Sequence, residues 1–318
     1  MHPINGGPVV LSGTAHVGLS EKICQYLGIA VGKAEVFKFS NDNTFVRILE
    51  NVRARDVFVV QPTVEPVNDH IMEMLIMIDA AHRASAGRIT AVVPYYSYAR
   101  TDKKDQPRVP ITGRLIADLL ETAGADRFLT VDLHAGQVQG FFRVPVDELT
   151  AMPMLSKYFV EKELDAPVVV SPDFGSSKRA RDFAHIMDAP VAMVEKRRTG
   201  NDDSVEIHNV IGDVNGRNAI LIDDEIATGG TMMAAATGLR QNGAREVYVA
   251  AAHGVFPDNA AHNLAEMQEI SEIVIADTVP LPPHKQHEKI KVLSIAPLIG
   301  EAIDRIHKGR SVGALFPN

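Results

Sequence analysis

Residues Ala219–Thr231 read AILIDDEIATGGT, an apolar run that ends in two adjacent acids and continues into small, hydroxyl-bearing and glycine residues. The apolar part, Ala219–Asp223, is typical of a strand buried on both faces of a parallel sheet. A helical pattern follows over Thr231–Asn242. A strand that passes through a glycine-rich turn into a helix predicts an α/β fold, in which ligands collect at the carboxyl ends of the strands.

The turn in this stretch has the composition of an anion-binding loop. Gly229 and Gly230 let the backbone approach a bound anion closely, and the start of a helix presents free N–H groups and the positive end of its dipole. Thr228 and Thr231 add hydroxyl donors, and the two acids suit sugar hydroxyls or Mg²⁺. A plain strand-to-helix turn with capping residues is the alternative, but it gives the adjacent acids no role.

The same alternation extends outward along the chain. Apolar, β-branched runs predict strands at Pro8–Gly13, Ala34–Phe39, Val57–Gln61, Ile89–Pro94, Arg127–Asp132, Pro167–Ser171, Val191–Glu195, Glu246–Ala251, Glu272–Ala276 and Val292–Ile295. Helical patterns lie between them, as at Asn68–Ala86, Thr112–Ala123, Met152–Glu163, Lys178–Met187 and Asn259–Ile270. The strand series runs twice, which predicts two α/β halves with a boundary near residues 143–149. The polar stretch 197–216 predicts a hairpin flap or a mobile loop.

Composition excludes several classes of protein. The 318 residues carry 32 Lys and Arg against 40 Asp and Glu, a formal net charge of −8. We therefore expect neither wholesale nucleic-acid binding nor binding to an anionic membrane. The single cysteine, Cys24, rules out a disulfide framework within the chain and fits the cytoplasm, and no apolar run approaches the ~20 residues of a membrane span.

The stretch 219–231 resembles the motif that binds 5-phosphoribosyl-1-pyrophosphate (PRPP) in type I phosphoribosyltransferases and PRPP synthetases. The rest of the chain resembles the ribose-phosphate diphosphokinase, or PRPP synthetase, family, in that family's order and at about its spacing. The segments that carry the resemblance are FSNDN (39–43), YARTDKK (98–104), VDLHA (131–135), QGFF (139–142), SPDFG (171–175) and KRR (196–198). A phosphoribosyltransferase would account for only about the second half.

The resemblance implies two phosphoribosyltransferase-like domains, each a mainly parallel sheet flanked by helices, with a flexible β-hairpin loop in the second. Residues 1–145 would form the ATP side and residues 146–318 the ribose 5-phosphate side, with the last helix free to pack back on the N-terminal domain. The active site would lie between the halves. The implied reaction is Mg²⁺-dependent transfer of the β,γ-diphosphate of ATP to the 1-hydroxyl of ribose 5-phosphate, giving PRPP and AMP.

The resemblance also implies roles for individual residues. Asp223 and Asp224 would hold the ribose hydroxyls, and His134 and Asp173 would bind Mg²⁺. Lys196 would act in catalysis together with Arg198 by neutralising the transferring diphosphate. The implied 5-phosphate contacts are Ala227, Thr228, Gly229, Gly230 and Thr231. The implied ATP contacts are Phe39, Asn41, Asn43, Arg100, Thr101, Asp102 and His134. Arg108 and Ser311 resemble regulatory anion contacts.

The chain departs from the family's usual pattern at some of these positions. Ala227 stands where the PRPP loop of typical synthetases has a third acid, and Asn41 and Asn43 stand where the adenine segment usually has acids. These departures leave open a catalytically weak, regulatory homologue, and a PRPP-consuming phosphoribosyltransferase is a second alternative. The family resemblance further implies a cytoplasmic, dimer-based homo-oligomer, a hexamer being one such form.

Overall fold

The computed structural model describes residues 4–198 and 205–316, without the side chains of 196–198 and 205–208. It contains two compact units. The first comprises residues 1–149, 278–280 and 294–318, and the second comprises residues 150–277 and 281–293. The division between residues 145 and 146 stays a prediction; in the structure, strand β7 (Val146–Leu149) pairs with β6 (Arg127–Val131) of the first unit.

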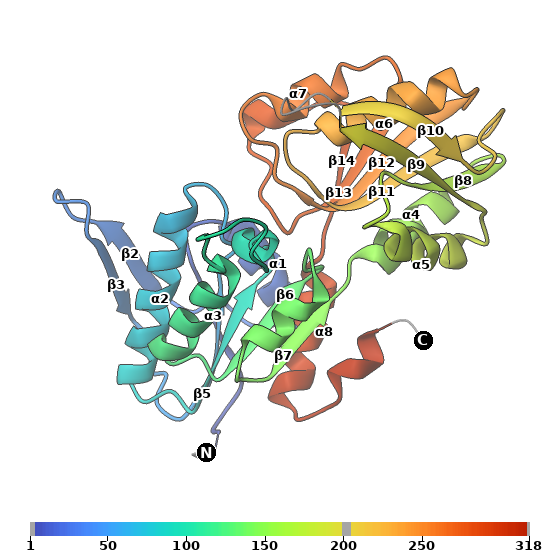
Figure 1. Cartoon of the computed structure of the whole chain (residues 1–318). Helices are drawn as coiled ribbons and strands as arrows, with labels where there is room; N and C mark the ends of the chain where they lie inside the picture. The colour runs from blue at the N-terminus through green and yellow to red at the C-terminus, as the bar shows by residue number, and fades with distance from the viewer. Residues whose placement is uncertain (1–3, 199–204, 317–318) are drawn as a thin grey trace. The chain divides into compact units, whose positions relative to one another are not determined.

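The first unit is built on a five-stranded parallel sheet in the order β1-β4-β5-β6-β7, of which the last three strands are labelled in Figure 1. Its further strands are β1 (Val9–Ser12), β4 (Asp56–Val60) and β5 (Arg88–Val93). Helix α2 (Val67–Arg83) packs on β4, β5 and helix α3 (Thr112–Ala123), and short helices η1 (Ser97–Arg100), η2 (Gly136–Phe141) and η4 (Val312–Leu315) complete the unit. Every residue of β4 is buried, as expected for a strand covered on both faces.

Two strands of the first unit stand apart from this sheet. Strands β2 (Ala34–Lys38) and β3 (Thr44–Ile48) form a separate antiparallel hairpin. The prediction of a strand at Ala34–Phe39 is confirmed, and this strand lies outside the parallel sheet. The residues of β2 are half-buried or exposed, because only one face of the hairpin packs against the rest of the unit.

Helix α8 (Ala296–His307) completes the first unit from the far end of the chain and packs on helix α1 (Val17–Leu27). The helices approach closely at Gly300, where an added Cβ would lie 2.5 Å from Tyr26 Cδ1. The fully buried Asp56 anchors the end of α8. It accepts from Arg88 at 2.9 and 2.6 Å and lies 3.0 Å from Nδ1 of His307. The fold thus ties the last helix to the beginning of β4.

The second unit is built on a seven-stranded sheet in the order β10-β9-β8-β11-β12-β13-β14. All pairs are parallel except the hairpin of β9 (Val191–Arg198) and β10 (Val205–Ile211). The other strands are β8 (Pro167–Ser171), β11 (Asn218–Ile226), β12 (Glu246–Gly254), β13 (Ile270–Ala276) and β14 (Ile290–Leu293). The helices are α4 (Met152–Glu161), α5 (Ser177–Met187), α6 (Gly230–Gln241) and α7 (Ala260–Ala265), with the short η3 (Pro283–Lys285).

The α/β prediction with two mainly parallel sheets is therefore confirmed. Each unit has its own apolar core, with Val59, Met74 and Phe128 in the first and Val170, Leu221 and Phe256 in the second. Cys24 is buried in α1, as the sequence predicts. None of the helices within the described ranges is long and apolar enough to cross a bilayer.

Candidate active site

The acidic pair lies at the carboxyl end of β11, a strand flanked by β8 and β12. The Asp223 side chain is 16% exposed and that of Asp224 only 6%. Ser176 Oγ donates to Asp223 Oδ1 at 2.7 Å, and the backbone N–H of Asp224 donates to the same oxygen at 3.0 Å. Arg179 Nη1 lies 3.2 Å from Asp224 Oδ1 and 3.5 Å from Asp223 Oδ1. Two carboxyl groups are thus held side by side with one guanidinium.

Burial and the neighbouring acid control how this pair ionises. Loss of solvent, followed by the contact with Asp224, raises the pKa of Asp223 from 3.8 to about 7, while Ser176 and Arg179 act in the opposite direction. Two adjacent carboxyls resist double ionisation because the like charges repel. Near neutral pH the charge of Asp223 therefore changes with pH, and its strength as an acceptor for sugar hydroxyls increases as the pH rises.

The glycine-rich turn follows directly and leads into α6. Gly229 takes the left-handed conformation, with φ of 79°, at the N-cap of the helix, where a side chain would be strained. The first turn of any α-helix leaves its leading amides without helical partners. The amides of Gly230 and Thr231 occupy that position here, beside the exposed Thr228. The amides and the hydroxyl of this turn are the donors that an anion would need. That the turn binds the 5-phosphate stays a prediction.

The loop after β8 brings Asp173 to the same edge of the sheet. Its Oδ1 accepts from the backbone N–H of Ser176 at 3.1 Å. His134 lies in the first unit, exposed, just after β6. Within the described ranges no three His, Cys, Asp or Glu side chains gather as a metal site. A single carboxylate such as that of Asp173 is a suitable ligand for Mg²⁺, which keeps waters and binds substrate phosphates rather than filling an all-protein cage. The pairing of Asp173 with His134 stays a prediction.

The predicted adenine contacts lie at the tip of the β2–β3 hairpin. The Phe39 side chain is 50% exposed, so it is not a core residue. Its ring packs edge-on against Phe37 and Phe45, with centroids 5.2 and 5.6 Å away. Asn41 Oδ1 accepts from the backbone N–H of Asn43 at 3.3 Å, which shapes the turn. The hairpin therefore presents an aromatic face and an amide at one place.

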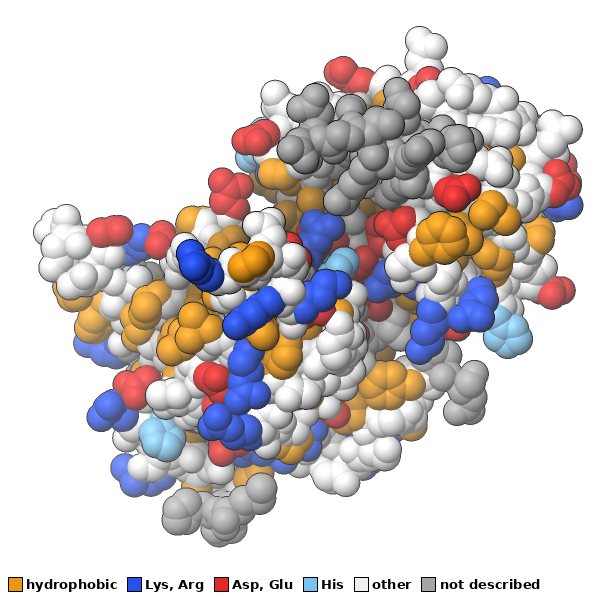
Figure 2. Space-filling view, in the orientation of Figure 1, with side chains coloured by type: hydrophobic (Ala, Val, Ile, Leu, Met, Phe, Trp, Pro, Cys, Tyr) orange, Lys and Arg blue, Asp and Glu red, His pale blue; other side chains and the backbone are white. Residues whose placement is uncertain are grey.

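The predicted phosphate contacts of the first unit follow η1. Arg100 ends this short helix and is exposed. Thr101 Oγ1 donates to Tyr98 O at 2.8 Å and accepts from the Gly113 amide at 3.0 Å, so this hydroxyl ties η1 to α3. Asp102 is buried and accepts from Gln137 Nε2 at 2.6 Å. Figure 2 shows Lys and Arg side chains gathered on the visible face of this unit, so cations concentrate locally in a chain of net charge −8.

The remaining predicted residues are placed only in part. The backbone of Lys196 and Arg198 lies in β9, opposite Ile207 and Val205 of β10, and their side chains fall outside the description. The connection 199–204 also lies outside the described residues. Arg108 and Ser311 are exposed residues of the first unit.

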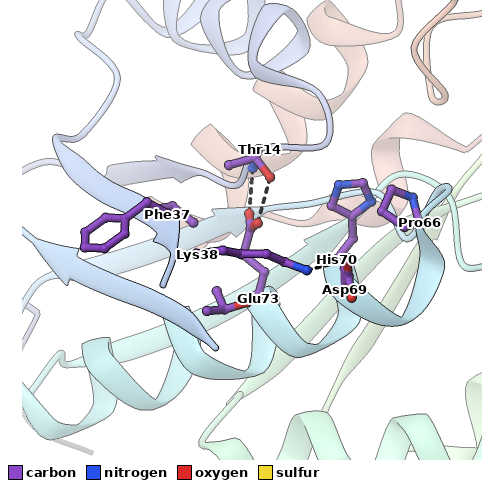
Figure 3. Close-up of a pocket in the computed structure, with 9 residues that line it drawn as sticks. Thr14, Phe37, Lys38, Pro66, Asp69, His70 and Glu73 are labelled. Carbon is purple, nitrogen blue, oxygen red and sulfur yellow. Dashed lines mark hydrogen bonds and ion pairs between the residues drawn. The ribbon is translucent and has the colours of Figure 1, made fainter. Parts of the chain in front are cut away.

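A pocket of about 220 Å³ lies beside the β2–β3 hairpin, and none of the nine residues lining it belongs to the predicted site (Figure 3). Glu73 enters from α2 and accepts from the amide and hydroxyl of Thr14 at 2.6 and 2.7 Å. Lys38 pairs with Asp69 at 2.7 Å across the pocket. The Glu73 contacts hold the loop after β1 against α2, and the Lys38–Asp69 pair joins strand β2 to the same helix.

Sequence reasoning did not identify Ser176 and Arg179, although both contact the acidic pair. A serine just before a helix is typically interpreted as a cap, and an arginine in a helix as a surface charge. The signal that could have found them is topological, since the loop after β8 meets the end of β11 only if the two strands are neighbours. The sequence alone does not give that order.

An acidic pair and an anion-binding turn at the carboxyl end of a parallel strand define a phosphoribosyltransferase-type α/β protein. Two family models match the chain, the N-terminal domain of ribose phosphate pyrophosphokinase at residues 8–124 and the phosphoribosyl synthetase-associated domain at residues 204–317. The chain belongs to the ribose-phosphate pyrophosphokinase, or PRPP synthetase, family.

Individual relatives cover nearly the whole chain. A ribose-phosphate pyrophosphokinase of Caldanaerobacter subterraneus is 51% identical over 96% of this chain and 97% of its own length. That of Clostridium acetobutylicum is 49% identical over 96% of both chains. The crystal structure of phosphoribosylpyrophosphate synthetase from Mycobacterium smegmatis superposes with a TM-score of 0.90 at 42% identity, covering 96% of this chain and 100% of that one.

Proposed function

We infer that this chain makes PRPP and AMP from ATP and ribose 5-phosphate. The observation that carries this inference is the similarity to ribose-phosphate pyrophosphokinases over 96% of the chain, at up to 51% identity. The acidic pair followed by the anion-binding turn supports it, because a sugar phosphate carries both groups that such a site recognises.

In this proposal the second unit binds ribose 5-phosphate. The carboxylates of Asp223 and Asp224 accept from the ribose hydroxyls, and the amides of residues 227–231 donate to the 5-phosphate. Ala227 removes one acid from the family's usual loop, but its backbone amide still serves the phosphate. The 1-hydroxyl is thereby oriented for attack, and orientation supplies much of the catalysis in phosphoryl-group transfer.

The first unit binds ATP. The exposed Phe39 ring stacks on the adenine, the amides of Asn41 and Asn43 contact its edge, and Arg100, Thr101 and Asp102 lie at the phosphates. His134 and Asp173 would hold Mg²⁺, which neutralises phosphate charge when bound. Lys196 and Arg198 neutralise the diphosphate as it transfers. We further propose a dimer-based homo-oligomer in the cytoplasm.

The test is an assay of the purified protein with ATP, Mg²⁺ and ribose 5-phosphate, in which AMP and PRPP are followed separately. Both products appearing in equal amounts, and only when the sugar phosphate is present, would support the proposal. A folded protein that releases no AMP at any ATP concentration would contradict it and favour the regulatory homologue.

A further inference from the structure

Ser176 occupies the position of a helix cap without acting as one. It is the N-cap residue of α5, and its hydroxyl makes no hydrogen bond to the helix. A serine at this position usually accepts from an amide of the first turn, which stabilises the helix. Here the side chain is buried, and its hydroxyl points to another strand of the sheet. A residue in a binding site that departs from its usual structural role, here helix capping, indicates a functional role.

The two hydrogen bonds that Ser176 donates join two carboxylates of the site. Its backbone N–H donates to Asp173 Oδ1 at 3.1 Å, and its hydroxyl donates to Asp223 Oδ1 at 2.7 Å. Asp173 follows β8 and Asp223 lies near the end of β11, neighbouring parallel strands. One residue therefore sets the position of the proposed metal carboxylate relative to the proposed ribose carboxylate.

We propose that Ser176 is a positioning residue for ribose 5-phosphate, which orients the Asp223 carboxylate for the sugar hydroxyls. This inference rests on the proposed function. The donors from Ser176 and Asp224 converge on Oδ1, so Oδ2 is the oxygen that accepts from the sugar. The short hydrogen bond also favours the charged form of Asp223, which is the stronger acceptor.

The test compares Ser176→Ala with Ser176→Thr, which keeps the hydroxyl, and with Ser177→Ala, which removes the neighbouring hydroxyl. For Ser176→Ala we expect the KM for ribose 5-phosphate to rise about tenfold, because hydrogen bonds to charged groups are among the stronger ones. We expect kcat and the KM for ATP to change less than threefold. The Mg²⁺ dependence stays the same, because the bond to Asp173 comes from the backbone. Ser176→Thr restores most of the affinity, and Ser177→Ala resembles the parent.

Thermal melting separates positioning from a structural role. A structural defect in Ser176→Ala would lower the melting temperature and raise both KM values together, whereas a positioning defect raises the KM for ribose 5-phosphate alone. An unchanged KM for ribose 5-phosphate would overturn the proposal. A lowered melting temperature with both KM values raised alike would also overturn it.

A calorimetric titration with ribose 5-phosphate alone separates this inference from the proposed function. If the parent protein binds the sugar phosphate but makes no PRPP, the proposed function fails. Tenfold weaker binding by Ser176→Ala would then still support the positioning role. Equal binding by the two proteins, or no binding by the parent, would overturn it.

Discussion

Replacing Arg179 by Met should move the pH at which ribose 5-phosphate binds, and the structure gives the size of the shift. The guanidinium lies 3.2 and 3.5 Å from the two acids, and its side chain is 18% exposed. A cation at this distance lowers a carboxyl pKa by about 1–3. Burial, Asp224 and Ser176 all act more strongly than Arg179 on the pKa of Asp223, which is about 7 with Arg179 present, so we expect the loss of Arg179 to raise it by at most about 1, the low end of that range.

The direction of the pH effect on affinity follows from the protonation state of Asp223 that binds the sugar. The carboxylate accepts from the sugar hydroxyls, so affinity rises as pH passes upward through the pKa of Asp223. A rise of about 1 in the pKa would lower the ionised fraction at pH 7 from about one half to about one tenth, so the loss of affinity at pH 7 is at most roughly fivefold. At pH 9 Asp223 is largely ionised in both proteins, and the loss nearly disappears. The 5-phosphate of the substrate titrates near pH 6 in both proteins, so the comparison between them removes its effect.

The assay is calorimetric binding of ribose 5-phosphate between pH 6 and 9. Arg181→Met is the matched control, because Arg181 lies on the same helix and is exposed. We expect its profile to match that of the parent protein. A loss of affinity in Arg179→Met that is equal at every pH would refute the reasoning, because it would mean that the arginine acts on the substrate directly rather than through Asp223.

Three further substitutions test the proposed site and the fold. Lys196→Ala should lower turnover by orders of magnitude without changing thermal melting, because a cation beside the transferring diphosphate is lost; normal turnover would exclude the catalytic role. Ala227→Asp should leave inorganic phosphate binding largely intact and change ribose or Mg²⁺ affinity, both measurable by titration; complete loss of folding would mean that the loop is misassigned. Asp56→Ala should destabilise the first unit by about 3–5 kcal/mol in urea unfolding, because Arg88 loses its buried partner. Asp79→Ala breaks an exposed pair and is the control, and equal unfolding midpoints would contradict the prediction.

The sequence predicts the fold wherever burial alone decides it. Strands β8, β11 and β12 are continuous apolar runs, so each is recognisable without knowledge of its neighbours. Strand β7 reads VDEL and β3 reads TFVRI, both only half-buried, and neither was predicted. Such strands are stabilised by their partners in the sheet rather than by their own pattern.

In the candidate site too, the sequence predicts the residues that share one stretch but not those brought together by the fold. The acids and glycines of the turn are contiguous in sequence, so their chemistry can be inferred from one stretch. Ser176 and Arg179 reach Asp223 from 47 and 44 residues away in sequence, counting back from residue 223. Their role depends on strand order, and strand order is a property of the folded chain. Local sequence therefore predicts what the site binds, but not what holds its carboxylates in place.

Because α8 belongs to the first unit, synthesis on the ribosome leaves that unit incomplete for an interval. Residues 150–307 must be added before the last helix can dock. At 5–20 residues per second this takes roughly 8–32 s. During that time the surface of α1 that packs on α8 is uncovered, and the Asp56–Arg88 pair lacks its contact with His307. Nascent chains are therefore expected to be open to chaperone binding on the N-terminal half until α8 docks.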